Sequence, residues 1–117
     1  MVKNVEHEQT HEILMEFTKE VKNILGESLK KVILYGSYAR GDYTESSDID
    51  IMILVDSTED TIKQKGRMVS DITFDFNLDH DIMIMPIVKA AEHFRYWLPV
   101  YPFYQNVERE GVKLYVA

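Results

Sequence analysis

Two short motifs near the middle of the chain carry residue types that suit phosphate chemistry. Gly36-Ser37 follows one apolar run, and Asp48-Ile49-Asp50 opens the next after ten intervening residues. Strand side chains alternate between the two faces, so Asp48 and Asp50 are predicted to point the same way. Neighbouring ionised carboxylates repel each other unless cations lie between them, and Mg²⁺ prefers such hard oxygen ligands. The pair therefore indicates a metal site.

A third carboxylate would allow this site to hold two ions. Asp81, at the start of a later apolar run, is the preferred candidate, and Asp79 is the alternative. Two Mg²⁺ ions about 3.5 to 4 Å apart can stabilise the attacking and the leaving oxygen of an in-line phosphoryl displacement. Asp48, Asp50 and Asp81 are therefore the predicted catalytic and metal-binding residues.

The Gly-Ser pair and a nearby arginine could bind the phosphates of a nucleoside triphosphate. Gly36 permits a tight turn that lets a phosphate approach the main chain, and Ser37 can donate its hydroxyl at the first turn of a short helix. Arg40 lies one helical turn further on, where it could contact a phosphate or pair with an acid of the loop 41–47. Gly36, Ser37 and Arg40 are the predicted nucleotide-binding residues.

Hydrophobic periodicity predicts the elements that position these residues. Val32–Tyr35 is predicted to be a strand buried on both faces, and Asp48–Val55 a strand with Met52 and Leu54 on the face of the aspartates. Capping-box spacing between Ser57 and Asp60 predicts a helix that ends near Phe76. A strand over 79–88 would then place Asp81, Met83 and Met85 on one face.

The remaining segments complete a small domain. The patterns predict an amphipathic helix over about 6–25, short helices over about 90–98 and 102–110, and a final strand over 112–116. Strands and helices in this order predict an α/β (α+β) fold with a small mixed β-sheet and flanking helices. At 117 residues the chain is expected to form a single domain, 1–117.

Composition excludes several classes of protein. The formal net charge of −7 disfavours general nucleic-acid binding, and the absence of Cys excludes disulfides, thiolate catalysis and Cys-bound metals. No segment has the apolar length of a membrane span or a signal peptide, so we expect a cytoplasmic protein with no membrane association. A homo- or hetero-oligomer remains compatible with the small size.

The histidines offer a weaker alternative metal site. His7-Glu8-Gln9-Thr10-His11 matches the zinc signature H-E-x-x-H. The motif lacks a plausible third ligand downstream, so an exposed polar helical turn is the preferred interpretation. His80 and His93 are interpreted as surface or packing residues.

The central motifs resemble a known family. Gly36-Ser37, ten residues, then Asp48-Ile49-Asp50 is similar to the signature of the polymerase-beta-like nucleotidyltransferases. The longer segment Gly36–Gly41 with Ser47–Ile51, and the ending Pro102–Tyr115, resemble the minimal, MntA-like nucleotidyltransferases that are encoded beside HEPN-domain partners.

The resemblance implies an enzyme that transfers AMP from ATP, with Mg²⁺, to a hydroxyl group. In the MntA-like group the acceptor is a tyrosine of a HEPN-domain RNase toxin, which the modification silences, so the enzyme acts as an antitoxin. The resemblance assigns metal binding to Asp48 and Asp50, phosphate binding to Gly36 and Ser37, and the third acid to Asp81. Two alternatives stay open: transfer to a small-molecule hydroxyl such as that of an antibiotic, and a non-enzymatic module that covers its partner.

Overall fold

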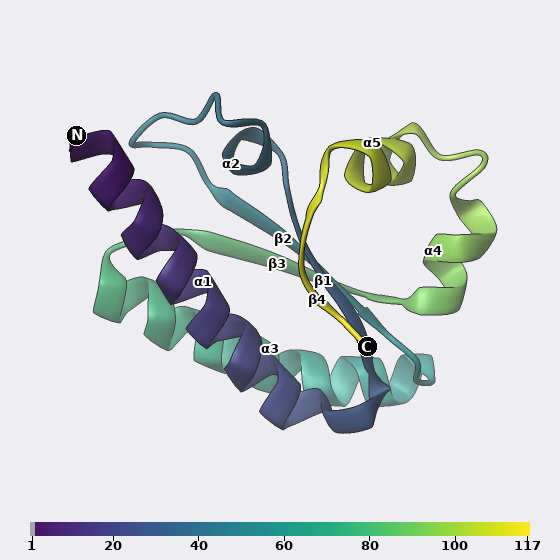
Figure 1. Cartoon of the computed structure of the whole chain (residues 1–117). Coiled ribbons are helices and arrows are strands. Elements are labelled where there is room, and N and C mark those ends of the chain that lie inside the picture. The colour runs from purple at the N-terminus through teal and green to yellow at the C-terminus, as the bar shows by residue number, and fades with distance from the viewer. Residues whose placement is uncertain (1) are drawn as a thin grey trace.

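The computed structural model describes residues 2–117, with side chains from residue 8 onward. Along the chain the elements are α1 (Val2–Leu25), the 3-10 turn η1 (Gly26–Ser28), β1 (Leu29–Tyr35), α2 (Ser37–Arg40), β2 (Ile49–Val55), α3 (Glu59–His80), β3 (Ile84–Ala90), α4 (Ala91–Trp97), α5 (Pro102–Glu110) and β4 (Val112–Val116). Figure 1 shows a single sheet with α1 and α3 on one face and α4 and α5 on the other. The predicted mixed sheet with flanking helices is confirmed.

The sheet has four strands in the order β3-β2-β1-β4. β1 is antiparallel to both β2 and β4, whereas β2 and β3 are parallel and are joined by α3. The antiparallel register places Tyr35 opposite Asp50, and the parallel register places Met85 opposite Asp50 on the other side. The start of β2 therefore lies between β1 and β3, with a neighbour of Asp50 on each.

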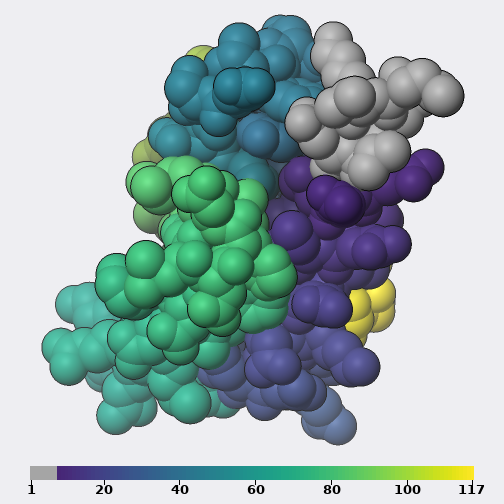
Figure 2. Space-filling model, turned by 90° about the vertical axis from the view of Figure 1, so that its left-hand side faces the viewer, coloured from purple at the N-terminus to yellow at the C-terminus, as the bar shows by residue number. Residues whose placement is uncertain are grey.

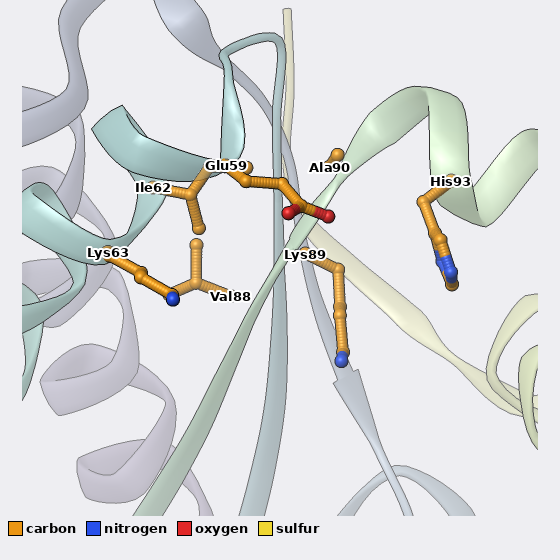
Figure 3. A pocket seen from close by; sticks show the side chains of 7 residues that line it. All are labelled: Glu59, Ile62, Lys63, Val88, Lys89, Ala90 and His93. Carbon is orange, nitrogen blue, oxygen red and sulfur yellow. The ribbon is translucent and has the colours of Figure 1, made fainter.

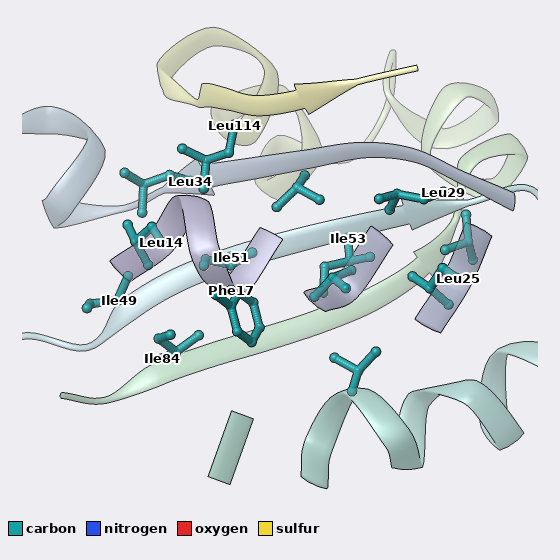
Figure 4. Close-up of a cluster of buried hydrophobic side chains, with 14 residues drawn as sticks. Leu14, Phe17, Leu25, Leu29, Leu34, Ile49, Ile51, Ile53, Ile84 and Leu114 are labelled. Carbon is teal, nitrogen blue, oxygen red and sulfur yellow. The ribbon is translucent and has the colours of Figure 1, made fainter. Parts of the chain in front are cut away.

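β2 is buried on both faces, and its alternation is as predicted. Ile49, Ile51 and Ile53 belong to the main core with side chains of α1 and α3, as Figure 4 shows. Met52 and Leu54 belong to a second cluster, which includes residues of α4 and α5. Asp50 lies two residues before Met52, and alternate residues of a strand point to the same face, so Asp50 lies on this second face. On the second face, Asp50 therefore lies next to the apolar cluster, at the end of β2 that follows the loop.

The predicted junction between α3 and the next strand is wrong. α3 continues to His80, so Asp79 is helical, and Asp81 ends the helix in the left-handed conformation at φ 52°. The side chain of Asn77 then accepts a hydrogen bond from Ile84 N at 2.7 Å and donates one to Ile84 O at 3.2 Å. This clamp fixes the start of β3 at Ile84, so Asp81 does not share a strand face with Met83 and Met85.

The predicted capping box at the start of α3 is also wrong. Thr58 is the N-cap, and its side chain accepts a hydrogen bond from Thr61 N at 3.3 Å. Ser57 lies one residue too early to fill this role. Within residues 2–117, no helix combines the length and apolar character needed to cross a membrane.

Candidate active site

The turn after β1 presses against one of the two aspartates. Gly36 has φ 76° and ψ −153°, a conformation that is essentially restricted to glycine. A Cβ at this position would overlap Asp50 Oδ2, so the main chain of Gly36 lies directly against the carboxylate. The structure thus brings together the Gly-Ser motif and the second residue of the Asp-x-Asp motif.

The electrostatics of Asp50 reflect its position between strands. Burial and, secondly, the charge of Asp48 raise the pKa of Asp50 above its ordinary value, and Arg40 partly opposes this shift. Burial and, secondly, Asp50 raise the pKa of Tyr35, its cross-strand neighbour, to about 12. The neighbouring carboxylates of Asp48 and Asp50 form a hard-oxygen donor set, which fits Mg²⁺.

The short helix α2 carries Ser37 and Arg40. The oxygen of Gly36 accepts hydrogen bonds from Ala39 N and Arg40 N, each at 3.1 Å, which closes the helical turn. Among the described residues, none makes a hydrogen bond with Ser37 Oγ, so this hydroxyl can donate to a ligand. The predicted position of Ser37, at the first turn of a short helix, is confirmed.

Arg40 takes part in two ion pairs. Its Nε lies 3.2 Å from Asp42 Oδ2, and its Nη1 lies 3.3 Å from Glu110 Oε2 at the end of α5. The second pair ties α2 to α5 across 70 residues of sequence. Of the two predicted roles, pairing with an acid of the adjoining loop is present in the structure.

Asp81 reaches the site from the end of α3 rather than from a strand. A hollow of about 290 Å³, here called the Asp48 hollow, is lined by side chains of the loop before β2 and of the turn before β3, among them Asp48 and Asp81. Within the part of the chain whose side chains are described, no three His, Asp or Glu residues lie close enough to hold one metal ion. The predicted acids are therefore near neighbours without forming a closed set of three.

Met85 occupies the place where a strand-borne third acid would lie. Its Cα is in register with that of Asp50 on the adjacent parallel strand, and Ile84 and Ile49 pair on the opposite, buried face. Met85 thus shares the face of Asp50, and 47% of its surface is exposed. Sequence reasoning missed this neighbour because the register depends on where β3 begins.

The loop 41–47 is ordered by its own hydrogen bonds and by an aromatic stack. Thr44 N donates to Ser47 Oγ at 2.8 Å, and Ser47 N donates to Thr44 O at 3.1 Å. The rings of Tyr38 and Tyr43 stack with centroids 4.1 Å apart and an interplanar angle of 6°. Tyr38 also lines the Asp48 hollow, so the stack forms part of the rim of the site.

A second, smaller hollow lies on the other side of the Gly36 turn. It has a volume of about 180 Å³ and lies between the end of β1, α2 and α5, where Tyr35, Gly36, Arg40, Phe103 and Glu110 are among its lining residues. Phe103 packs edge-on against Tyr35, with ring centroids 5.6 Å apart. Sequence analysis did not anticipate this contribution of α5, because nothing local links α5 to the Gly-Ser motif.

A further hollow, of about 310 Å³, lies at the opposite end of the sheet (Figure 3). It is formed by the first turns of α3, the end of β3 and His93 of α4. His93 Nδ1 lies 2.9 Å from Tyr104 Oη, so this exposed histidine joins α4 to α5. In the alternative H-E-x-x-H motif, the side chain of His7 lies outside the described residues, and His11 is exposed.

Comparisons with known proteins agree with this geometry. The sequence matches the nucleotidyltransferase domain family over residues 14–105. Two proteins of Methanocaldococcus jannaschii that carry the name protein adenylyltransferase are similar to this chain. One is 47% identical over 66% of this chain and 76% of the relative. The other is 39% identical over 87% of this chain and 94% of the relative. A chain in the crystal structure of a toxin-antitoxin complex with AMP-PNP shares the fold, with a TM-score of 0.57 and 20% identity over 88% of this chain and 73% of that chain.

Proposed function

Because the chain belongs to the nucleotidyltransferase domain family, we propose that it transfers AMP from ATP to a tyrosine hydroxyl of a HEPN-domain toxin encoded nearby, and so acts as its antitoxin. The observation that carries this proposal is the packing of Gly36 against Asp50, which joins a phosphate-binding turn to a metal-binding acid. The names of the similar archaeal proteins support protein as the acceptor, and the fold shared with a toxin-antitoxin complex supports a toxin partner.

Each motif has a defined part in this reaction. Asp48 and Asp50 would hold Mg²⁺, which supplies positive charge to the phosphates of ATP and lowers the pKa of the attacking hydroxyl. Ser37 would donate its hydroxyl to a phosphate, and Gly36 would let that phosphate approach the main chain. Asp81, across the Asp48 hollow, remains the proposed third acid.

The transfer itself is an in-line displacement. The acceptor hydroxyl loses its proton to the solvent, its oxygen forms a bond to the α-phosphorus of ATP, the bond between the α-phosphorus and the bridging oxygen breaks, and pyrophosphate leaves. Arg40 lies on the side of the turn that faces α5, where its guanidinium could exchange a carboxylate of its ion pairs for a phosphate of ATP. The two hollows beside the Gly36 turn offer separate spaces for nucleotide and acceptor.

The test is transfer of label from α-labelled ATP to the purified partner protein. Wild-type protein should label a tyrosine of the partner in the presence of Mg²⁺, and Asp48→Asn with Asp50→Asn should abolish the labelling. Asp60→Asn is the matched control, because Asp60 is an exposed acid in the first turn of α3, outside the site. Robust transfer by the double variant would overturn the proposal.

Two other outcomes would redirect it. Labelling of a small-molecule hydroxyl but of no protein would assign the enzyme to a different acceptor class. Neutralisation of the partner by the double variant without ATP would show that binding alone is sufficient.

A further inference from the structure

A hollow that the proposed reaction does not use lies on the second face of the sheet, toward the end of β2 away from Asp50. It has a volume of about 340 Å³. Pockets of about 300 to 1,000 Å³ are typical of small-molecule sites. Leu54, which lines the hollow, comes four residues after Asp50 and therefore about 13 Å further along the strand. This hollow, here called the lysine hollow, is thus separate from the site of the aspartates.

Three strands and α4 form the walls of the lysine hollow. The strand registers place Lys31 between Leu54 of β2 and Val116 of β4, and all three line the hollow. Phe94 and Leu98 line it from α4, where Phe94 is buried in the apolar cluster of the second face and Leu98 packs against that cluster. Leu54 and Phe94 are 2% and 4% exposed, so the hollow has a fixed apolar floor.

A β-bulge turns two neighbouring lysines toward this floor. The register between β1 and β2 shifts between Leu29 and Lys31, so Lys30 is the extra residue of the bulge. Leu29 and Val32 both belong to the main core on the other face, although residues three apart point to opposite faces in a regular strand. The bulge therefore leaves Lys30 and Lys31 together on the second face, and both line the hollow.

The charges around the lysine hollow leave its two lysines without an anionic partner. Both lysines are partly buried, and within the described side chains neither forms an ion pair. Arg95 also lines the hollow and pairs with Glu92 at 3.6 Å, whereas Glu108 contributes a carboxylate to the lining. The described lining is therefore net positive, in a chain whose formal net charge is −7.

An apolar floor beside unpaired ammonium groups suits a ligand that is both apolar and anionic. An apolar body against Leu54 and Phe94 is favourable because apolar surface leaves water. A carboxylate or phosphate group at the end of that body can accept charge-assisted hydrogen bonds from Lys30 and Lys31. A purely hydrophilic anion lacks the first contribution, and the lysines repel an apolar cation.

We propose that the lysine hollow binds a small amphipathic anion, with an aliphatic or aromatic body on the apolar floor and a carboxylate or phosphate group at Lys30 and Lys31. This site is additional to those for nucleotide and acceptor, and it does not depend on the proposed transfer reaction. A bound ligand connects α4 with the ends of β1 and β2, so saturating ligand should raise the unfolding temperature.

The test is a titration followed by the NMR chemical shifts of the backbone amides, with octanoate as the probe. Octanoate should cause saturable shifts at Lys31, Leu54 and Phe94, and octyl phosphate should do the same. Octylammonium keeps the apolar body but reverses the charge, whereas inorganic phosphate is an anion without an apolar body. Neither of these two should cause saturable shifts at the three residues.

A pair of lysine substitutions tests the anionic end of the ligand. Lys30→Gln with Lys31→Gln should raise the Kd for octanoate about tenfold or more, because charge-assisted hydrogen bonds are lost. Lys19→Gln with Arg67→Gln is the matched control, since it removes the same charge from exposed positions on α1 and α3. Figure 2 shows α1 (purple) and α3 (teal) side by side at the surface, and both helices cover the other face of the sheet. The control should bind octanoate like wild type.

Ala91→Leu tests the apolar floor. Ala91 lines the hollow from the first turn of α4, so a larger side chain there should weaken octanoate binding while both lysines remain. AMP-PNP binding should be the same in all variants, because the lysine hollow is separate from Asp50. The proposal is overturned if wild type shows no saturable shifts with octanoate, or if octylammonium causes equal shifts. An unchanged Kd in the lysine double variant, or an equal loss in its control, would also overturn it.

Discussion

Gly36 and Asp50 are in direct contact across the β1–β2 hairpin, because the missing side chain of Gly36 leaves the space that Asp50 Oδ2 occupies. The Gly-Ser and Asp-x-Asp motifs are therefore parts of one packed unit. A change at either residue alters the position of the other.

Gly36→Ala should uncouple this unit. Alanine is strained at φ 76°, and its Cβ would displace the Asp50 carboxylate. Gly41→Ala is the matched control, since Gly41 has φ 85° but open space around it. Both variants should lose about 1 to 3 kcal/mol of unfolding free energy. Only Gly36→Ala should also lower the transfer rate, by a factor of about 100, because the carboxylate of Asp50 is misplaced. Equal activity of the two variants would contradict this coupling.

Met85→Asp should strengthen metal binding. The substitution places a third carboxylate in register with Asp50, on the same face of the sheet. Mn²⁺ affinity, measured by electron paramagnetic resonance, should rise about tenfold, because affinity for hard cations follows the number of charged oxygen ligands. Met85→Leu keeps the shape without the charge and should leave the Mn²⁺ affinity unchanged. A variant with no gain would show that the position does not face the metal site.

Arg40→Ala and Glu110→Gln separate the two roles of Arg40. Loss of a charge-assisted phosphate contact should raise KM for ATP about tenfold in Arg40→Ala. Glu110→Gln breaks the exposed pair between α2 and α5, together with the longer contact of Glu110 with Arg109 at 3.8 Å, and should change stability little, with KM unchanged. If both variants shift KM equally, Arg40 acts by holding α5 in place.

Tyr35 should ionise late in an alkaline titration. Its pKa is raised from 10.0 to about 12, so the native state retains the proton that the unfolded state loses. The stability linked to Tyr35 is present below pH 10 and is lost as the pH rises toward 12. Ultraviolet absorbance should show a late phenolate transition that Tyr35→Phe removes and Tyr96→Phe retains. Retention of that transition in Tyr35→Phe would contradict the assignment.

Gly66→Ala should stabilise the protein. Gly66 lies within α3 with open space around it, so alanine should raise the free energy of unfolding by up to about 1 kcal/mol. Gly111→Ala should do the opposite, because its Cβ would overlap Val107 O and Ile33 Cγ2. Thermal or urea unfolding of both variants measures the difference. A destabilised Gly66→Ala would mean that α3 needs its glycine for another reason.

The local parts of the site could be predicted from the sequence, since they depend on periodicity within single elements. The strand positions of Asp50 and Met52, and the turn at Gly36, follow from alternation and from glycine's conformational freedom. The structure confirms the fold class and adds the direct contact of Gly36 with Asp50, which the sequence did not predict.

The remaining parts depend on contacts between distant segments. Asp81 lies at a helix end because Asn77 clamps Ile84, and a sequence pattern does not reveal that hydrogen bond. Met85 beside Asp50 follows only once the register of β3 is known, and the Arg40–Glu110 pair joins residues 70 positions apart. The sequence supplied the residue types, whereas the register decided which of them became neighbours.

The β1–β2 hairpin also bears on how the protein folds. Gly36, Ser37, Asp48 and Asp50 all lie within residues 36–50, so closing one short loop brings them together. Short loops cost little entropy to close, and local contacts favour fast folding. The nucleotide end of the site thus has the connectivity of an early-forming unit. The contact of α5 with it closes a much longer loop and is expected to form later.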